Sequence, residues 1–398
     1  MKNIQKWFKV SAIFMIASIS YPVSARFWFD IVPLEQILQN NPSIKYIQCT
    51  EKMPYEVASF KAEPLIPCKV VFDELFVLTI PNGRVQAKDG HVLIGDKFIK
   101  EFIWADRPEF LEDLERISDN QVKKVSGRVA VIAHKFYNYN SHFLHEALGR
   151  LVLLEINNIE YDWLYIPYET FFIKKFLELW GVDPKKIISP TDNNFCIQAD
   201  ELIVPSFVIS KDVRFDHFGL NVHPYIMHYV KNKLIEVVHA KQITQQTFSE
   251  KVFVSRRDAN QRKILNEDDV FALFEPLGFV RYELSKMSVE QQILLFQNAK
   301  IVIGEMGSGL TNILFCSPDT LVIELFQSVV DNSNWWIAEN FGLRYFSIKT
   351  LNIDTSWVVN WRPYYWVYYQ AGLSIINIPL DNIYPLVEML KIFRICKT

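Results

Sequence analysis

The chain has 398 residues, of which 50% are hydrophobic and 22% are charged, and its formal net charge is −3. This length favours two domains, each large enough to bury a core of its own. Because the charge is nearly balanced and the sequence contains no basic tract, nothing favours nucleic acid as a partner.

Residues 1–25 have the pattern of an export or anchoring segment. Lys2, Lys6 and Lys9 precede the uncharged, largely apolar run Val10–Val23, and a small-residue cleavage pattern ends at Ala25. The run is shorter than the about 20 residues of a spanning helix. We expect a signal peptide, with an uncleaved membrane anchor or an amphipathic first helix as alternatives. A signal peptide or a membrane anchor would make the protein exported or membrane-associated through residues 1–25. The sequence does not indicate the compartment.

The sequence carries no recognisable metal or redox motif. Its five cysteines are scattered without a Cys-x-x-Cys pair, and it has neither an Asp-x-Asp triplet nor a His-Glu-x-x-His pattern. We therefore expect no resident metal or cofactor. Cys49 and Cys68 could pair in an exported chain, whereas Cys196 and Cys316 are expected as buried free thiols.

The first half of the chain predicts an α/β domain, residues 26–240. Segments 70–80 and 92–103 have the composition of strands, with turns expected at 81–83 and 88–90. From Arg128 onward strands and helices alternate, which is typical of a parallel sheet covered on both faces. The expected strands are Arg128–His134, Trp163–Ile166 and Glu201–Val204, and the expected helices are His142–Ile156, Phe171–Trp180 and Pro224–Val238.

The polar stretch His239–Glu250 marks the expected boundary to a second α/β domain, residues 241–398. Asn266 is placed to cap one helix, and Ser288 with Gln291 has the spacing of a capping box. A terminal helix, residues 381–395, could pack back on the first domain. The other expected helices are 266–274, 289–297, 310–316 and 335–341, and the expected strands are 251–255, 279–283, 300–304, 321–325 and 344–348.

Residues 300–324 (KIVIGEMGSGLTNILFCSPDTLVIE) form the most informative stretch. They predict a buried strand, a tight turn through Gly304, Gly307 and Gly309, a helix and a second strand. The first amides of a helix lack partners within it and can bind an anion, so the turn suits a phosphate-bearing ligand. A turn needed only for packing is the alternative. The glycine order differs from the GxGxxG of nicotinamide enzymes, which disfavours an oxidoreductase.

Polar side chains follow three strands of the predicted second sheet. Arg256 and Arg257 come after the first strand, the glycine turn follows 300–304, and Glu324 lies at the end of 321–325. Ligands of open parallel sheets bind beyond the carboxyl ends of the strands. Cations and free amides there suit a diphosphate, and a carboxylate suits ribose hydroxyls. Each residue also has a plain alternative as a solvated surface group.

His142, Glu146 and Arg150 are spaced at i, i+4 and i+8 on the first predicted helix. A histidine in the first turn, beside a carboxylate that fixes its tautomer, is a candidate general base. The alternative is an exposed face with an ion pair between Glu146 and Arg150. The aromatic groups Trp335-Trp336 and Trp361–Tyr369 suit core packing better than sugar stacking.

The segments Ser255–Phe279 and Gly304–Leu325 resemble glycosyltransferase family 61. Members of that family carry a Ser-Arg segment, a downstream Arg and Asn-Glu, then a glycine motif followed by Leu-Thr-Asn and a Glu at the next strand end. The segment Asn138–Leu151 is similar to the family's Asn-Tyr-x-His-Trp-Leu segment. The matching positions in the second half are Ser255, Arg256, Arg262, Asn266, Glu267, Gly304, Gly307, Gly309, Leu310, Asn312 and Glu324.

The resemblance implies a GT-B fold, with two Rossmann-like domains facing each other across a cleft. It implies inverting, metal-independent transfer from a nucleotide-sugar donor, held by the second domain, to a glycan, glycoprotein or glycolipid acceptor. His142, helped by Glu146, is then the expected base or acceptor-positioning group. The expected donor-site residues are Arg256, Arg262, Asn266, Gly307, Ser308, Gly309, Leu310, Asn312 and Glu324.

One position departs from the family pattern Gly-x-His-Gly-Ala-Gly. Met306 stands where the family has histidine, and a methionine cannot donate a hydrogen bond to a leaving diphosphate. This motivates a second hypothesis, a catalytically weakened member that binds nucleotide sugars or glycans as a scaffold.

Overall fold

The computed structural model describes residues 30–50, 53–56, 69–104, 111, 114, 116–210, 221–241, 247–259, 262–326, 333–349, 375–376, 378 and 380–395. The expected leader, residues 1–25, lies outside these residues, as do Cys68 and the aromatic segment Trp361–Tyr369. Within the described part, no helix combines the length and apolarity that a bilayer crossing requires. Cys49, Cys196 and Cys316 are free thiols there, the last two buried as expected.

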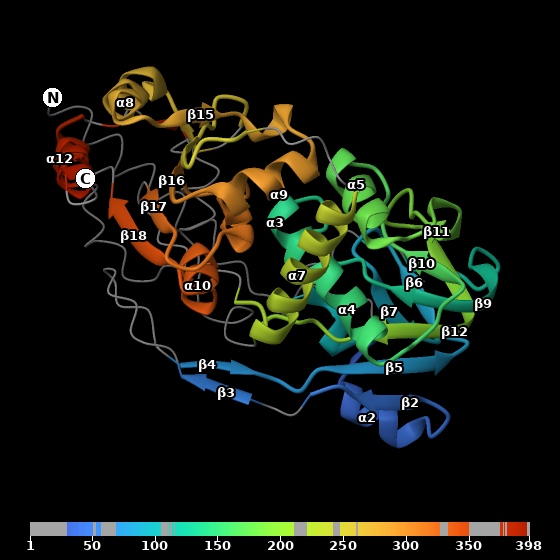
Figure 1. Ribbon diagram of the computed structural model, residues 1–398. Coiled ribbons are helices and arrows are strands. Elements are labelled where there is room, and N and C mark those ends of the chain that lie inside the picture. Colours follow the sequence, from blue (N-terminus) through green and yellow to red (C-terminus); the bar gives the residue numbers. More distant parts are fainter. Residues whose placement is uncertain are drawn as a thin grey trace, which may run out of the picture.

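A ten-stranded mixed sheet organises the first half of the chain (Figure 1). Its strands are β1 (Asp30–Val32), β2 (Lys45–Gln48), β5 (Phe76–Pro81), β6 (Arg84–Gln86), β7 (His91–Ile94), β8 (Lys97–Ile99), β9 (Lys123–Val131), β10 (Trp163–Tyr165), β11 (Ile187–Ile188) and β12 (Cys196–Pro205). β12, β9, β10 and β11 run parallel in that spatial order. On its other edge β12 pairs antiparallel with β5 and β6, and β6, β7, β8 and β1 continue the sheet. β3 (Met53–Glu56) and β4 (Lys69–Phe72) form a separate antiparallel pair.

The parallel arrangement predicted from Arg128 onward is confirmed, since β12, β9, β10 and β11 are parallel, whereas the strands before β9 make the sheet mixed. The turn expected at 81–83 is present, with the N–H of Gly83 donating to the carbonyl of Ile80 at 3.2 Å and Asn82 at φ 55°, but it does not reverse the chain, because β5 and β6 both pair with β12. The turn at 88–90 is confirmed as the β6–β7 hairpin, with Gly90 at φ 68°. Segment 92–103 is likewise divided, since Gly95 at φ 62° reverses the chain between β7 and β8.

Helices cover this sheet where the apolar periodicity predicted them. α5 ends at Gly181 in a left-handed conformation, φ 89°, as expected for a glycine cap. The helices are α2 (Leu34–Asn40), η1 (Lys100–Phe102), α3 (Asn140–His142), η4 (Phe143–Ala147), α4 (Leu148–Ile156), α5 (Phe171–Trp180), η5 (Pro184–Lys186) and α7 (Pro224–Ala240).

Five parallel strands form the sheet of the second half, in the order β15-β13-β16-β17-β18. They are β13 (Lys251–Val254), β15 (Val280–Tyr282), β16 (Ile301–Glu305), β17 (Leu321–Phe326) and β18 (Arg344–Lys349), and β14 (Lys263–Ile264) pairs separately with β19 (Ile375–Ile376). The helices are α8 (Glu267–Phe274), η6 (Glu275–Leu277), η7 (Leu284–Lys286), α9 (Val289–Asn298), η8 (Leu310–Phe315), α10 (Ser333–Asn340), η9 (Leu380–Asn382) and α12 (Tyr384–Ile395). The capping box of Ser288 and Gln291 on α9 is confirmed.

The two halves of the chain share a hydrophobic core. One apolar cluster contains strand residues of the first sheet together with residues of β13, α9, η8 and α10. α7 contacts α4 and α5 on one side and α9 and η8 on the other (Figure 1). Fold class is therefore α/β as predicted, while the division at residues 240 and 241 stays a prediction.

The described core residues of the terminal helix α12 pack within the second half of the chain, and packing against the first domain stays a prediction. Leu386, Val387 and Leu390 of α12 belong to a second apolar cluster, with Phe253 of β13 and Phe274 of α8. Trp335 and Trp336 are also core residues, 9% and 0% exposed, so core packing is confirmed for this pair.

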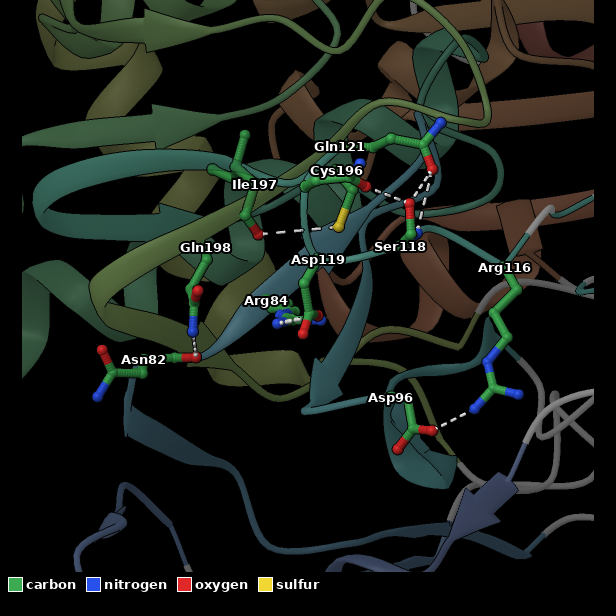
Figure 2. A network of polar contacts seen from close by, with 11 residues as sticks. Asn82, Arg84, Asp96, Arg116, Ser118, Asp119, Gln121, Cys196, Ile197 and Gln198 are labelled. Carbon is green, nitrogen blue, oxygen red and sulfur yellow. Dashed lines mark hydrogen bonds and ion pairs between the residues drawn. The ribbon is translucent and has the colours of Figure 1, made fainter.

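Figure 2 shows the polar contacts around the segment that leads into β9. Arg84 of β6 donates to Asp119 at 2.8 Å, and the Ser118 hydroxyl donates to Gln121 at 2.5 Å. On β12, Gln198 donates to the carbonyl of Asn82 at 3.0 Å. Such exposed contacts stabilise a fold weakly. They hold the amino end of β9, whose carboxyl end leads into the candidate site.

Candidate functional site

Three adjacent strands deliver the predicted donor-site residues to one edge of the second sheet. β13, β16 and β17 lie side by side and parallel, and Val254 pairs with Gly304, which pairs with Glu324. Arg256 follows β13 and the glycine turn follows β16. The convergence expected from the sequence is therefore present in the fold.

The guanidinium group of Arg256 lies directly against the glycine turn. A Cβ on Gly307 would be 2.2 Å from Nη1 and 2.8 Å from Cζ of Arg256. Only a residue without a side chain leaves that space free, which gives a physical reason for glycine at position 307. Nε of Arg256 donates to the carbonyl of Arg262 at 3.0 Å, and Arg262 has a φ of 54°. The unusual backbone of Arg262 thus helps to aim Arg256 at the turn.

Three consecutive amides of the turn have no acceptor in the part of the protein that the structure describes. Among the described residues, nothing accepts a hydrogen bond from the backbone N–H of Gly307, Ser308 or Gly309. Gly307 is buried, whereas Ser308 and Gly309 are partly exposed. Successive unpaired amides beside a cation form an anion-binding arrangement.

The helix expected over 310–316 is a 3₁₀-helix of six residues, Leu310–Phe315. The amides of Leu310 and Asn312 are used within the turn, by the carbonyls of Gly307 and Gly309. Leu310 is fully buried, and the Asn312 side chain donates to Gly309 and to Gln292. These two residues therefore shape the turn, while the open amides lie just before the helix.

A buried carboxylate organises the segment that carries Arg256. Glu267, 2% exposed, accepts from the Ser255 hydroxyl at 2.6 Å and from the backbone N–H of Arg256 at 2.9 Å. Its Oε1 also lies 3.4 Å from Nε of Arg257. The conformation of the Ser-Arg-Arg segment after β13 is thus fixed by a residue at the start of α8.

The other two predicted donor-site residues are engaged within the protein. Asn266 exchanges two hydrogen bonds of 2.8 Å with the backbone of Ile378, and its side chain does not cap α8 as expected. Glu324 is 2% exposed and accepts hydrogen bonds from Asn334, at 2.6 Å, and from the Tyr345 hydroxyl. A role for Glu324 toward ribose stays a prediction.

His142 and Glu146 form a hydrogen-bonded pair. Nδ1 of His142 lies 2.5 Å from Oε1 of Glu146, which is completely buried, whereas the His142 side chain is 24% exposed. The pair lies at a π-helical turn, Phe143–Ala147, between α3 and α4. Such turns often mark functional sites.

The environment of Glu146 keeps it ionised. Burial alone raises the pKa of Glu146, but attraction to the imidazoles of His134 and His142 when these are protonated, together with the hydrogen bonds from His142 and the indole N–H of Trp104, more than offsets this, so its pKa lies below the ordinary value. A carboxylate only accepts hydrogen bonds, so Nδ1 of His142 carries the shared proton. In the neutral ring, Nε2 then has the lone pair of a general base.

The alternative interpretation, an exposed helix face with an ion pair between Glu146 and Arg150, is wrong. Arg150 is 1% exposed, and its guanidinium donates to the carbonyl of Ala133 at 2.7 Å and to that of Pro205 at 2.8 and 3.0 Å. These carbonyls follow the ends of β9 and β12. Arg150 therefore ties the helix of His142 to the carboxyl edge of the first sheet.

The two parts of the candidate site meet at a pair of serines. Oγ of Ser141 lies 3.3 Å from Oγ of Ser308. Ser141 directly precedes His142, and Ser308 directly follows Gly307. The candidate base and the anion-binding turn are thus neighbours in space, although they are 167 residues apart in sequence.

Sequence patterns missed three residues of this arrangement. Trp104 was not singled out and His134 showed no partner pattern, since their contacts with Glu146 depend on the folded sheet. Glu267 was recognised as part of a motif without its positioning role. Among the described residues, no group of three histidines, cysteines or carboxylates is placed to ligate a metal.

Residues 141–323 match the family Glycosyltransferase 61, which confirms the resemblance seen in the sequence. The matched region contains His142, Glu146, Arg256 and the glycine turn.

Two relatives are similar to part of the chain. The EGF domain-specific O-linked N-acetylglucosamine transferase of Drosophila melanogaster is 30% identical over 117 residues, which cover 27% of this chain and 22% of that protein. The protein of the same name from Gallus gallus is 26% identical over 124 residues, covering 29% and 23%. The chain thus aligns with less than a quarter of the length of each relative.

Proposed function

We propose that this protein transfers a sugar from a nucleotide-sugar donor to a hydroxyl group of a glycan, protein or lipid acceptor, with inversion and without a metal. The observation that carries the proposal is the contact between Ser141 and Ser308, which sets a histidine–carboxylate pair beside an arginine and three open amides. The match of residues 141–323 to the family Glycosyltransferase 61 supports the same chemistry.

The proposed reaction is a single displacement. The acceptor oxygen forms a bond to the anomeric carbon while the bond from that carbon to the diphosphate oxygen breaks. The acceptor proton passes to Nε2 of His142. The electron pair of the broken bond leaves with the nucleoside diphosphate, and its charge is met by Arg256 and the amides of residues 307–309.

The donor and acceptor are proposed from the names of the relatives, both N-acetylglucosamine transferases specific for EGF domains. UDP-N-acetylglucosamine is therefore the first donor to test, with a folded EGF domain and free glycans as acceptors. We expect transfer by the wild type, detected as a mass increase of the acceptor, and loss of transfer in His142→Ala. Absence of both transfer and donor hydrolysis, with a range of nucleotide sugars, would contradict the proposal.

The nucleotide site has a separate test. Calorimetric titration with UDP and GDP should show binding that weakens by about 10- to 100-fold in Arg256→Ala, since hydrogen bonds to charged groups contribute about 1.5–3 kcal/mol. Equal affinity of both proteins would place the diphosphate elsewhere.

A second candidate function is nucleotide-sugar or glycan binding without catalysis. Met306, 7% exposed, follows β16 directly and leaves this part of the turn without a side-chain donor. Nucleotide binding in the absence of donor hydrolysis and transfer would favour this candidate.

We also propose that residues 1–25 direct the protein to export or hold it at a membrane, on the sequence pattern alone. N-terminal sequencing of the native protein tests this. A chain that begins near Arg26 indicates a cleaved leader, and an intact Met1 on a protein that remains in the soluble fraction contradicts the proposal.

A further inference from the structure

We infer that Trp104 is a positioning residue of the candidate site, holding Glu146 so that its carboxylate engages Nδ1 of His142. This inference rests on the proposed function for its catalytic consequence. Trp104 lies before residues 141–323, so the family match does not include it. The site is then completed by the part of the chain that precedes the matched region.

The indole N–H of Trp104 reaches a carboxylate that has few other donors. Nε1 of Trp104 lies 2.9 Å from Oε2 of Glu146, while Oε1 faces His142 at 2.5 Å. The two oxygens of one buried carboxylate thus have separate donors. Because Glu146 is 0% exposed, removing either donor leaves an oxygen of a buried carboxylate without its hydrogen bond, which is costly.

His134 does not take over this task. It is 0% exposed, and its Nδ1 lies 3.9 Å from Glu146 and accepts from the backbone N–H of Phe136 at 3.3 Å. Burial lowers the pKa of His134 to about 4, so its ring is neutral near pH 7. A nitrogen that accepts a hydrogen bond presents a lone pair, and it cannot donate to the carboxylate.

The backbone and ring of Trp104 are held firmly. Its neighbours Phe102 and Ile103 are 2% and 1% exposed, which anchors the chain after η1 in the core. The ring packs edge-on against Phe136, with centroids 4.6 Å apart, and Phe136 in turn lies 4.9 Å from the ring of His142. Trp104 therefore fixes the carboxylate from a rigid position, which is what a supporting residue of an active site requires.

The first experiment does not depend on activity. In protein labelled with ¹⁵N-histidine, the Nδ1 proton shared with Glu146 should give a low-field NMR signal, assigned by its loss in His142→Asn. We expect Trp104→Phe, which keeps a ring but removes the N–H, to abolish or shift this signal. Trp163→Phe is the matched control, because it removes an indole hydrogen bond to the carbonyl of Ser126, 3.2 Å long, in the first sheet and away from Glu146. If the phenylalanine variant does not fold, Trp104→Met fills the space with an apolar chain.

The second experiment is a double-mutant cycle on kcat. Alone, Trp104→Phe should reduce kcat by about tenfold or more with the donor KM unchanged, whereas in a Glu146→Gln background it should have little further effect. Trp163→Phe should leave both constants as they are. An unchanged NMR signal in Trp104→Phe, or additive losses in the cycle, would overturn the inference. If the wild type transfers no sugar, the proposed function fails, and the NMR signal still decides whether Trp104 positions Glu146.

Discussion

The guanidinium of Arg256 occupies the place where a side chain at position 307 would begin. A methyl group on Gly307 would lie 2.2 Å from Nη1 of Arg256, far inside van der Waals contact. The two positions are therefore interdependent, because the guanidinium of Arg256 lies so close to residue 307 that only glycine fits there. This relationship connects the turn after β16 with the segment after β13, and both have the chemistry of a diphosphate site.

Gly307→Ala tests that interdependence. The added methyl group displaces Arg256, so the Kd for UDP should rise about tenfold or more, as in Arg256→Ala, and the two changes together should weaken binding little beyond either one. Gly309→Ala is the control, because its Cβ would first meet Cδ1 of Leu284 at 3.3 Å, the movable end of a side chain. Calorimetry measures the affinities, and equal binding by wild type and Gly307→Ala would contradict the model.

The role of Glu267 predicts a loss of stability from a nearly isosteric change. In Glu267→Gln the buried negative charge beside Arg257 and Arg281 is lost, and an amide NH₂ replaces one of the two oxygens that accept from Ser255 and Arg256, so one of these hydrogen bonds is lost or reversed in direction. We expect a decrease of about 1–3 kcal/mol in the free energy of unfolding, measured with urea. The neighbouring Asp268, whose side chain is 71% exposed, pairs with Arg281 at the surface, and Asp268→Asn should cost at most about 1 kcal/mol. Similar losses in the two variants would refute a structural role for Glu267.

The elements found from sequence share a local cause. Phe171–Trp180 has an apolar stripe and a glycine cap, and Ser288 with Gln291 closes a capping box within one turn, so a few neighbouring residues suffice to predict them. The convergence on one sheet edge was also predictable, because parallel strands of one sheet all present their carboxyl ends on the same side.

What the sequence did not reveal depends on distant pairings. The turn at Asn82 does not reverse the chain, because β12, more than a hundred residues later, pairs with both β5 and β6. Trp104 meets Glu146 across 42 residues, and Ser141 meets Ser308 across 167. No periodicity within a segment carries such information, which explains why the donor side of the site was anticipated better than the support of His142.

Stability should depend on pH through a buried histidine. His145 is 2% exposed, neither ring nitrogen has a hydrogen-bond partner among the described residues, and burial, with a further contribution from His142, lowers its pKa to about 3. The unfolded chain binds this proton near pH 6.5 and the folded chain does not. Stability is therefore fully present above pH 6.5 and is lost as the pH falls from 6.5 toward 3, by about 1.4 kcal/mol per pH unit for one proton.

His145→Leu removes that proton uptake. Urea unfolding between pH 4 and 7 should show a shallower fall in stability than the wild type, with His134 still contributing through its pKa of about 4. At pH 7 the variant should be at least as stable, because an unpartnered polar ring has been replaced by an apolar side chain. The exposed His239, changed to glutamine, is the control and should keep the wild-type slope. An unchanged slope in His145→Leu would show that this histidine does not titrate on unfolding.

Met306 decides between the two candidate functions. It is 7% exposed, its backbone N–H donates to the carbonyl of Leu325 at 2.9 Å, and it directly precedes Gly307. A histidine here would add a donor next to the three open amides, where the charge of the leaving diphosphate develops, and one such donor is worth about 100-fold in rate. Met306→His should therefore raise the rate of transfer or donor hydrolysis by tenfold or more, with UDP affinity changed far less. Met306→Leu keeps an apolar side chain, so its reaction rate and its UDP affinity should equal those of the wild type. If the histidine variant folds and binds UDP but reacts no faster, then Arg256 and the amides already supply the stabilisation that the family obtains from its histidine. Met306 would then no longer be a reason to propose binding without catalysis.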